Sequence, residues 1–360
     1  MLPAGRGDCL WIEYGDPEGP HRILIDGGIH GTSRILRERI EALPEEDRRF
    51  DLLVITHIDF DHIAGILPLL RDPPRGLQFD DVWFNAWQHL PGAPRRLSSK
   101  QAEVLSTLIE GRRYPWNRSF GGKAVTIGDD GEPLAVPPLS GGMHLTLLGP
   151  TRHRLAALRL VWELEIREAG LKPGQAGETL EAAAAKRRKR RLMGELTTDV
   201  EALASSRFSP DSSEANGSSI AFLAKYDGKS CLFTGDAFAG DVLGAIHGLA
   251  AREGKTEFAV NALKLSHHGG HKNTSRELID ALVCDRFLIS TDGTIYEHPD
   301  RESVARVIVH GRKLGTPELC FNYRSEDNRL WDDETLAGST RRGYRRSFAP
   351  EGDTGLAVDL

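Results

Sequence analysis

The segment DLLVITHIDFDHIAG, residues 51–65, constrains the fold more than any other part of the sequence. Its first six residues are dominated by an apolar run, which is typical of a strand buried on both faces. Four imidazole or carboxylate side chains follow at once: His57, Asp59, Asp61 and His62. Alternation places the first three on one side of an extended loop, and a helical turn that begins there brings the fourth toward the same point. The spacing predicts a loop that holds two metal cations, with a polar helix-capping loop as the alternative.

The ligand types in this loop restrict the metal. Neutral imidazole and carboxylate are the ligands expected for Zn, Mn or Fe, and the share of carboxylates shifts the balance toward Mn. The expected cofactor is therefore a pair of divalent ions, Zn or Mn.

Short apolar runs alternate with helical spacing along the rest of the chain, which predicts an α/β protein. The strands are expected at 9–14, 22–26, 79–87, 145–148, 219–226, 230–234, 262–266 and 286–290. Helices are expected at 33–43, 98–111, 241–252 and 275–282.

The composition of residues 152–206 shifts to Leu, Ala, Glu, Lys and Arg and includes the run KRRKRR at 186–191. This predicts a helical insertion outside the core and beside the mouth of the site, where it is a candidate surface for a partner protein. Six consecutive cations spread around a helix, so they favour a phosphate ligand only weakly. The prediction is one domain over 1–360, with a first half at 1–150, the insertion at 152–206, a second half at 211–330 and a C-terminal tail at 331–360.

Charge and cysteine content exclude several classes. A net charge of -6 gives no attraction of the whole chain to nucleic acid. Four widely spaced cysteines without a CxxC pair are expected to be reduced thiols. The N-terminal residues lack a signal-peptide pattern, and no apolar run approaches the length of a membrane span. We expect a cytoplasmic protein without membrane association.

Three later positions carry further candidate ligands. Asp236 ends the apolar run of CLFTGDA, where it is exposed to a ligand or caps the next helix. His267 and His268 follow ALKLS, and because adjacent residues of an extended chain point to different sides, only one of them is expected to bind metal. His298, in YEHPD, is a metal ligand, a substrate-facing acid or a solvated side chain.

The loop THIDFDHIAG resembles the signature of metallo-β-lactamase-fold hydrolases, with Asp59 where most of that superfamily has His. Its form is most similar to the hydrolase domain of the ComEC/Rec2 proteins, as are GDCLWIEYG, ILIDGG, NGSS and LKLSHHGG. The resemblance implies an αββα sandwich of the metallo-β-lactamase type, here with a helical insertion. It covers most of the chain apart from the segments near 88–144 and 152–210.

The resemblance also implies residue roles. Asp236 matches the carboxylate that bridges two metals, and Asp26 matches one that supports the ligand loop by hydrogen bonding. Asp8, in GRGDC, matches an acid of the family, although Arg6 replaces a more usual His or Gln. Asn216 and Ser219 stand where the superfamily has a third histidine motif, and because both are weak ligands for Zn, one metal is expected to be held less tightly.

The implied reaction is hydrolysis of a phosphodiester, with nucleic acid as one candidate substrate. A metal-activated water attacks, Asp61 orients or deprotonates it, and one of His267, His268 and His298 protonates the leaving group. A phosphorylcholine-esterase-like small-molecule hydrolase is the alternative, because LKLSHHGGHKNTS resembles that family too. A regulatory module that binds metal without turnover is the third possibility, and the intact ligand loop argues against it.

Overall fold

The computed structural model describes residues 1–92, 100–168, 199–311, 315–340, 343–350 and 355–360. Within them, one sheet has the order β1-β2-β4-β6 and a larger sheet the order β16-β15-β14-β12-β10-β9-β8-β7. The strands of the first are β1 (Leu10–Tyr14), β2 (His21–Ile25), β4 (Leu52–Val54) and β6 (Val82–Trp83). Those of the second are β7 (Leu134–Ala135), β8 (His144–Gly149), β9 (Ala221–Tyr226), β10 (Lys229–Phe233), β12 (Ala262–Lys264), β14 (Arg286–Ile289), β15 (Glu318–Phe321) and β16 (Arg345–Phe348).

Two short parallel pairs extend these sheets: β3 (Arg49–Phe50) with β5 (Gln78–Phe79), and β11 (Phe258–Ala259) with β13 (Leu282–Val283). The strand predicted over 79–87 is therefore two separate strands, β5 and β6. The chain turns between them at Asp81, whose carboxylate accepts hydrogen bonds from three backbone amides.

The two main sheets pack face to face, because their strands are apolar on both sides. On β2, Ile23 and Ile25 belong to the cluster between the sheets, while Leu24 belongs to the cluster under the helices of the first half. On β9, Phe222 faces the first sheet and Leu223 faces the helices of the second half. This alternation produces four layers, with helices on both outer faces, as predicted.

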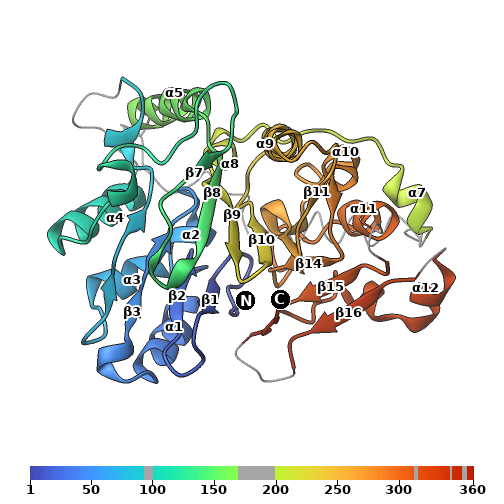
Figure 1. Ribbon diagram of the computed structural model, residues 1–360, viewed down its shortest axis with the longest axis horizontal. Helices are drawn as coiled ribbons and strands as arrows, with labels where there is room; N and C mark the ends of the chain where they lie inside the picture. Colours follow the sequence, from blue (N-terminus) through green and yellow to red (C-terminus); the bar gives the residue numbers. More distant parts are fainter. Residues whose placement is uncertain (93–99, 169–198, 312–314, 341–342, 351–354) are drawn as a thin grey trace.

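The helices cover the outer faces with amphipathic stripes. In α9 (Ala239–Arg252), Val242, Ala245, Ile246 and Leu249 are buried at spacings of three and four residues. Figure 1 shows α1 (Thr32–Glu41), α3 (Ile66–Arg71) and α4 (Lys100–Gly111) on the side of the first sheet, and α9, α10 (Arg276–Asp280) and α11 (Arg301–His310) on the side of the second. The other helices are α2 (Phe60–Ile63), α5 (Arg152–Glu168), α7 (Val200–Ala204), α8 (Glu214–Gly217) and α12 (Glu334–Ser339).

The predicted insertion at 152–206 is helical at both described ends, in α5 and α7. The expectation that it lies outside the core is wrong for α5, because Leu155, Leu158 and Trp162 are buried in the same cluster as Leu24. Their spacing places these three side chains on one face of α5, and this apolar face covers the core of the first half of the domain. Residues 169–198, with the KRRKRR run, lie outside the described residues.

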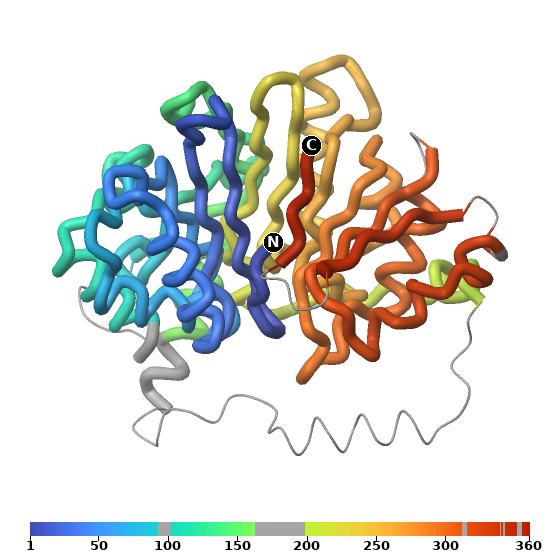
Figure 2. Tube along the Cα trace, turned by 90° about the horizontal axis from the view of Figure 1, so that it is seen from below, coloured from blue at the N-terminus to red at the C-terminus, as the bar shows by residue number. Residues whose placement is uncertain are grey.

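The segment 331–360 is not a tail. It contains α12 and also β16, which pairs in parallel with β15 at the edge of the large sheet. Figure 2 shows the two chain ends side by side, and the backbone amide of Leu356 donates to the carbonyl oxygen of Met1 at 2.9 Å. Leu356 and Val358 pack against the cluster between the sheets. The last residues therefore contribute to the core.

None of the helices in the described residues combines the length and the apolar character that a membrane span requires.

Candidate metal centre

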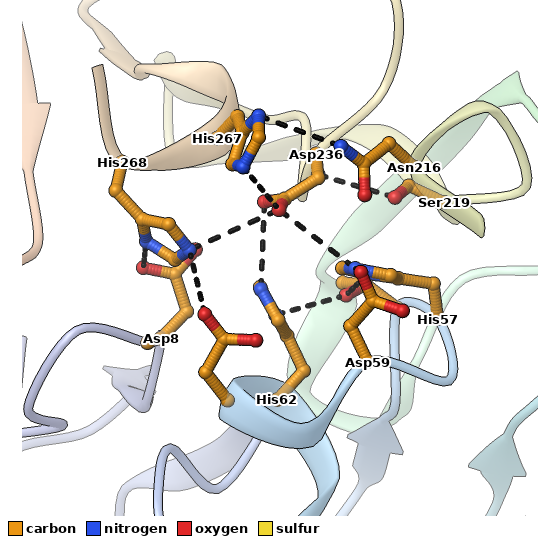
Figure 3. A network of polar contacts seen from close by, with 12 residues as sticks. Asp8, His57, Asp59, His62, Asn216, Ser219, Asp236, His267 and His268 are labelled. Carbon is orange, nitrogen blue, oxygen red and sulfur yellow. Dashed lines mark hydrogen bonds and ion pairs between the residues drawn. The ribbon is translucent and has the colours of Figure 1, made fainter. Parts of the chain in front are cut away.

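The loop after β4 carries its ligands from an extended segment into a helical turn. His57 lies three residues after the end of β4, Asp59 precedes α2, and Asp61 and His62 lie on α2 itself. The extended part and the turn occur as predicted. Figure 3 shows His57 and His62 directed toward Asp236, which follows β10, with Asp59 beside His57. His267 and His268, from the segment after β12, meet Asp236 from the other side.

The position of α2 depends on a close backbone contact. A Cβ on Gly65 would lie 1.9 Å from the carbonyl oxygen of Gly27, so only glycine allows the two loops to approach. The amide of Gly27 donates to the carbonyl oxygen of His62, and the amide of Gly65 donates to that of Gly28. These contacts bring the LIDGG and DHIAG motifs together and place Asp26 beside His62.

Hydrogen bonds set the tautomers of three histidines. Nδ1 of His62 lies 2.8 Å from Asp26 Oδ2, and Nδ1 of His268 lies 3.0 Å from the carbonyl oxygen of Ser290. Both oxygens only accept, so each Nδ1 carries the proton. The hydroxyl of Thr56 donates to Asp26 and is then free to accept from Nδ1 of His57 at 3.0 Å. In all three rings Nε2 is therefore the nitrogen left to bind a metal ion.

Those three Nε2 atoms are buried, and none has a hydrogen-bond partner among the described residues. They converge on the carboxylate of Asp236, at 3.7 Å for His57, 3.5 Å for His62 and 3.8 Å for His268. Lone pairs that face a carboxylate without a donor between them need a cation or a proton. The arrangement therefore fits a metal centre.

In the described residues three groups of possible ligand atoms share His62; one is formed with Asp8 and Asp26, and the other two are the candidates for metal binding. One contains His57, His62 and Asp236, and the other contains Asp61, His62 and His268, with all atoms of a group within 4.8 Å of one another. Asp59 lies 3.6 Å from Nε2 of His57 and extends the first group. Asp236 touches members of both groups, which is the position expected of a bridging carboxylate.

The charges at the centre favour a cation. Burial acts against ionisation of Asp236, but His62, His267 and His268 outweigh it and hold the pKa of this carboxyl well below its usual value. Burial also opposes protonation of His62, yet Asp236 and Asp26 raise the pKa of His62 well above its usual value in the metal-free protein. The excess of carboxylates over cationic side chains suits a divalent ion.

Asp8 supports the centre from the opposite side. Its Oδ2 accepts a hydrogen bond from the fully buried ammonium of Lys264 at 2.8 Å, and its Oδ1 lies 3.3 Å from Nδ1 of His268. Although burial raises the pKa of Asp8, Lys264 and His268 outweigh it and lower that pKa. Asp8 and Asp26 thus lie against Nδ1 of His268 and of His62, where a carboxylate orients the ring of a ligand histidine.

The expectation that His267 and His268 point to different sides is wrong. The chain leaves the extended conformation there and forms the turn η5 (Ser266–Gly269), in which φ is 50° for His267 and 56° for His268. Both Nε2 atoms lie 3.8 Å from Asp236 Oδ2 as a result. Left-handed backbone at two successive non-glycine residues costs of order 1 kcal/mol or more each, which is a form of strain common at functional sites.

His267 differs from His268 in its surroundings. It is 28% exposed, and no group of three ligand atoms in the described residues includes it. Its Nδ1 lies 3.0 Å from Asn273 Oδ1, while Asn216 and Asn273 both donate to Asp211. Asn216 therefore orients the surroundings of His267, and the hydroxyl of Ser219 accepts a hydrogen bond from the amide of Asp236.

His298 lies beside this cluster without joining it. Its ring centroid is 5.2 Å from that of His267, and its Nδ1 is 3.5 Å from Asp300 Oδ2.

All the predicted site residues are thus brought into one region. Four contributors were not predicted: Thr56, Asp211, Lys264 and Asn273. A lysine inside the apolar run ALKLS was a usable signal for Lys264, whereas nothing local marks Asp211.

The layered sandwich and the histidine and aspartate cluster at its edge define a metallo-β-lactamase fold. Residues 3–157 match the family model of the Metallo-beta-lactamase superfamily, whose members are mostly metal-dependent hydrolases. Among solved structures, the chain is similar to Zn(2+)-bound PqqB from Methylobacterium extorquens, with 14% identity, a TM-score of 0.42 and coverage of 99% of this chain and 88% of that chain. No curated protein matches the chain.

Proposed function

We propose that this protein is a metal-dependent phosphodiesterase that holds two divalent cations, Zn or Mn. The convergence of three unpartnered histidine nitrogens on Asp236 is the observation that carries this proposal. His57, Asp59 and Asp236 would hold one ion. Asp61, His62, His268 and the same Asp236 would hold the other. Asn216 stands near the first group, at a position where the superfamily has a ligand histidine. The ion held by this first group is therefore the weaker of the two.

Two bound cations would lower the pKa of a shared water toward neutrality and stabilise negative charge on the attacked phosphate. Asp61 is 15% exposed and lies 3.8 Å from Nε2 of His268, so its carboxylate reaches both the ligand group and the solvent side. From there it can accept a hydrogen bond from the attacking water. His298, beside His267 on the partly exposed side, remains as a donor to the substrate.

The choice of an anionic substrate is supported by Arg6. Its guanidinium carbon lies 5.5 Å from the ring centroid of Phe60, a 37% exposed side chain between Asp59 and Asp61. A cation already on this ring disfavours a quaternary ammonium such as choline and favours a phosphate. The similarity of the ligand loop to ComEC/Rec2 proteins adds support for a phosphodiester, with nucleic acid as the polymeric candidate.

The test combines metal content with substrate choice. The purified protein is analysed for transition metals, stripped with a chelator and reloaded with Zn or Mn. Rates are then measured on bis(p-nitrophenyl) phosphate, p-nitrophenyl phosphorylcholine, p-nitrophenyl acetate and a single-stranded oligonucleotide. We expect metal-dependent cleavage of the first and at most slow cleavage of the acetate. Metal binding without turnover of any substrate would instead favour a regulatory module, and preference for phosphorylcholine would favour the small-molecule esterase.

A further inference from the structure

Asp300 holds a helix-capping position but does not cap its helix. It directly precedes α11, where an aspartate usually accepts a hydrogen bond from the first helical amides, yet its carboxylate makes no such bond within the described part of the chain. Loss of that bond costs about 1 kcal/mol. Other contacts of this carboxylate must therefore matter to the protein.

Those contacts are two histidines. Asp300 Oδ2 accepts hydrogen bonds from the backbone amide and from Nδ1 of His271, each at 2.8 Å, and lies 3.5 Å from Nδ1 of His298. The carboxylate is buried, and although burial raises its pKa, the hydrogen bonds from His271 and the nearby ring of His298 lower it. Asp300 is therefore an anion that faces Nδ1 of His298.

His298 is held between two rings at the side of the metal centre. The ring of Tyr296, a 44% exposed residue, stacks against it with centroids 6.1 Å apart, and the ring of His267 meets it edge-on at 5.2 Å. Nε2 of His267 lies 3.8 Å from Asp236. The imidazole of His267 therefore lies between His298 and Asp236, the carboxylate proposed to bridge the two metals. With Nδ1 directed to Asp300, the ring nitrogen left for a substrate is Nε2.

We propose that Asp300 and His298 form the acid pair of the phosphodiesterase, with Asp300 as the positioning residue and His298 as the catalytic residue. This rests on the proposed function. In the doubly protonated ring of His298, Nδ1–H faces Asp300, whose negative charge stabilises the imidazolium and selects the ring orientation, so Nε2–H is available to the substrate. As water oxygen bonds to phosphorus, the bond from phosphorus to the leaving oxygen breaks, and that oxygen takes the proton from Nε2. The attacking water releases one proton to Asp61 and then to solvent, and Nε2 of His298 regains one proton from solvent, so one water is added across the bond.

His267 does not suit this role. Its Nδ1 lies at the carbonyl oxygen of the Asn273 side chain, which only accepts, so Nδ1 carries the proton and Nε2 faces Asp236. His268 is buried with its Nε2 toward Asp61 and Asp236. Of the three histidines considered for proton donation, His298 alone has no ring nitrogen within 4 Å of Asp61 or Asp236 in the described residues.

The experiment compares leaving groups. Wild type, Asp300→Asn, His298→Gln and the matched control His271→Gln are assayed with bis(p-nitrophenyl) phosphate and with diphenyl phosphate. The first releases a phenolate that leaves without protonation, whereas the second releases a more basic phenolate. We expect Asp300→Asn and His298→Gln each to lower kcat for diphenyl phosphate about 100-fold and for bis(p-nitrophenyl) phosphate by no more than about threefold. The double variant should be no worse than either single one.

The control separates catalysis from structure, because Asp300 also ties down His271. His271→Gln should leave the ratio of the two rates unchanged. Equal losses on both substrates, loss of metal from either variant, or the same ratio change in His271→Gln would overturn the acid pair while the phosphodiesterase stands. If wild type cleaves only bis(p-nitrophenyl) phosphate, the acid pair is also refuted. If metal-loaded wild type cleaves neither ester, the proposed function fails together with this inference. Should Asp300→Asn not fold, His298→Gln gives the same readout.

Discussion

Replacement of Asp236 by Asn tests the centre most directly, because this carboxylate lies within 3.5 to 3.8 Å of the Nε2 atoms of four histidines. The variant keeps the side-chain shape and the amide hydrogen bond to Ser219 Oγ, so the metal-free protein should fold. It loses one negative charge shared by both ligand groups. We expect metal stoichiometry to fall from two to at most one, and the phosphodiesterase rate to fall at least about 10³-fold, or about 4 kcal/mol.

The gain in unfolding free energy on metal binding is a second quantity that the variant should change. With free metal at 1,000 times Kd, binding stabilises the fold by about 4.1 kcal/mol, and a hundredfold weaker site leaves about 1.4 kcal/mol. The metal-induced gain in unfolding free energy should therefore shrink by about 2.7 kcal/mol in Asp236→Asn. Asp227→Asn, in the exposed turn before β10, is the matched control and should keep the full gain. A variant that retained both ions and a rate near wild type would show that Asp236 is not the bridge.

Three further predictions address the support of the site and the fold. Asp26→Asn should weaken metal affinity about 10- to 100-fold in a Mn titration, because it loosens the ring of His62, and unchanged affinity would contradict that role. Trp162→Ala should destabilise the protein by about 3 to 5 kcal/mol in urea, whereas Leu160→Ala on the exposed face of α5 should change little; equal effects would place α5 outside the core. Burial lowers the pKa of His89 from 6.5 to about 4. Its contribution to stability should therefore be complete above pH 6.5 and lost as the pH falls toward 4, and a pH profile that stays the same in His89→Gln would refute this.

The sequence predicted the layered fold through its resemblance to metallo-β-lactamase-fold hydrolases, and it predicted most of the side chains that the structure gathers at the candidate metal centre. Several predictive patterns lie within short stretches of the sequence: the apolar run before His57, the clustered ligands after it, and the helical stripes of α1 and α9. The type of an element and the face that it buries follow from side-chain periods that are visible within one element. The phosphodiester substrate, the identity of the metals and the ComEC/Rec2 subgroup are still predictions, because they depend on chemistry that residue order does not display.

The contacts between distant segments of the chain were decided only by the tertiary structure. Lys264 and Asp8 are 256 positions apart and form a buried ion pair that no local pattern implies. The paired histidines were expected to diverge because strand alternation was assumed, but the left-handed turn at 267 and 268 directs both toward Asp236. The burial of α5 and the pairing of β16 likewise required a partner surface elsewhere in the chain. Local sequence sets backbone periodicity over a few residues, whereas the ring nitrogen that His62 and His268 leave for a metal is set by Asp26 and Ser290, distant acceptors that reach the other nitrogen only in the folded chain.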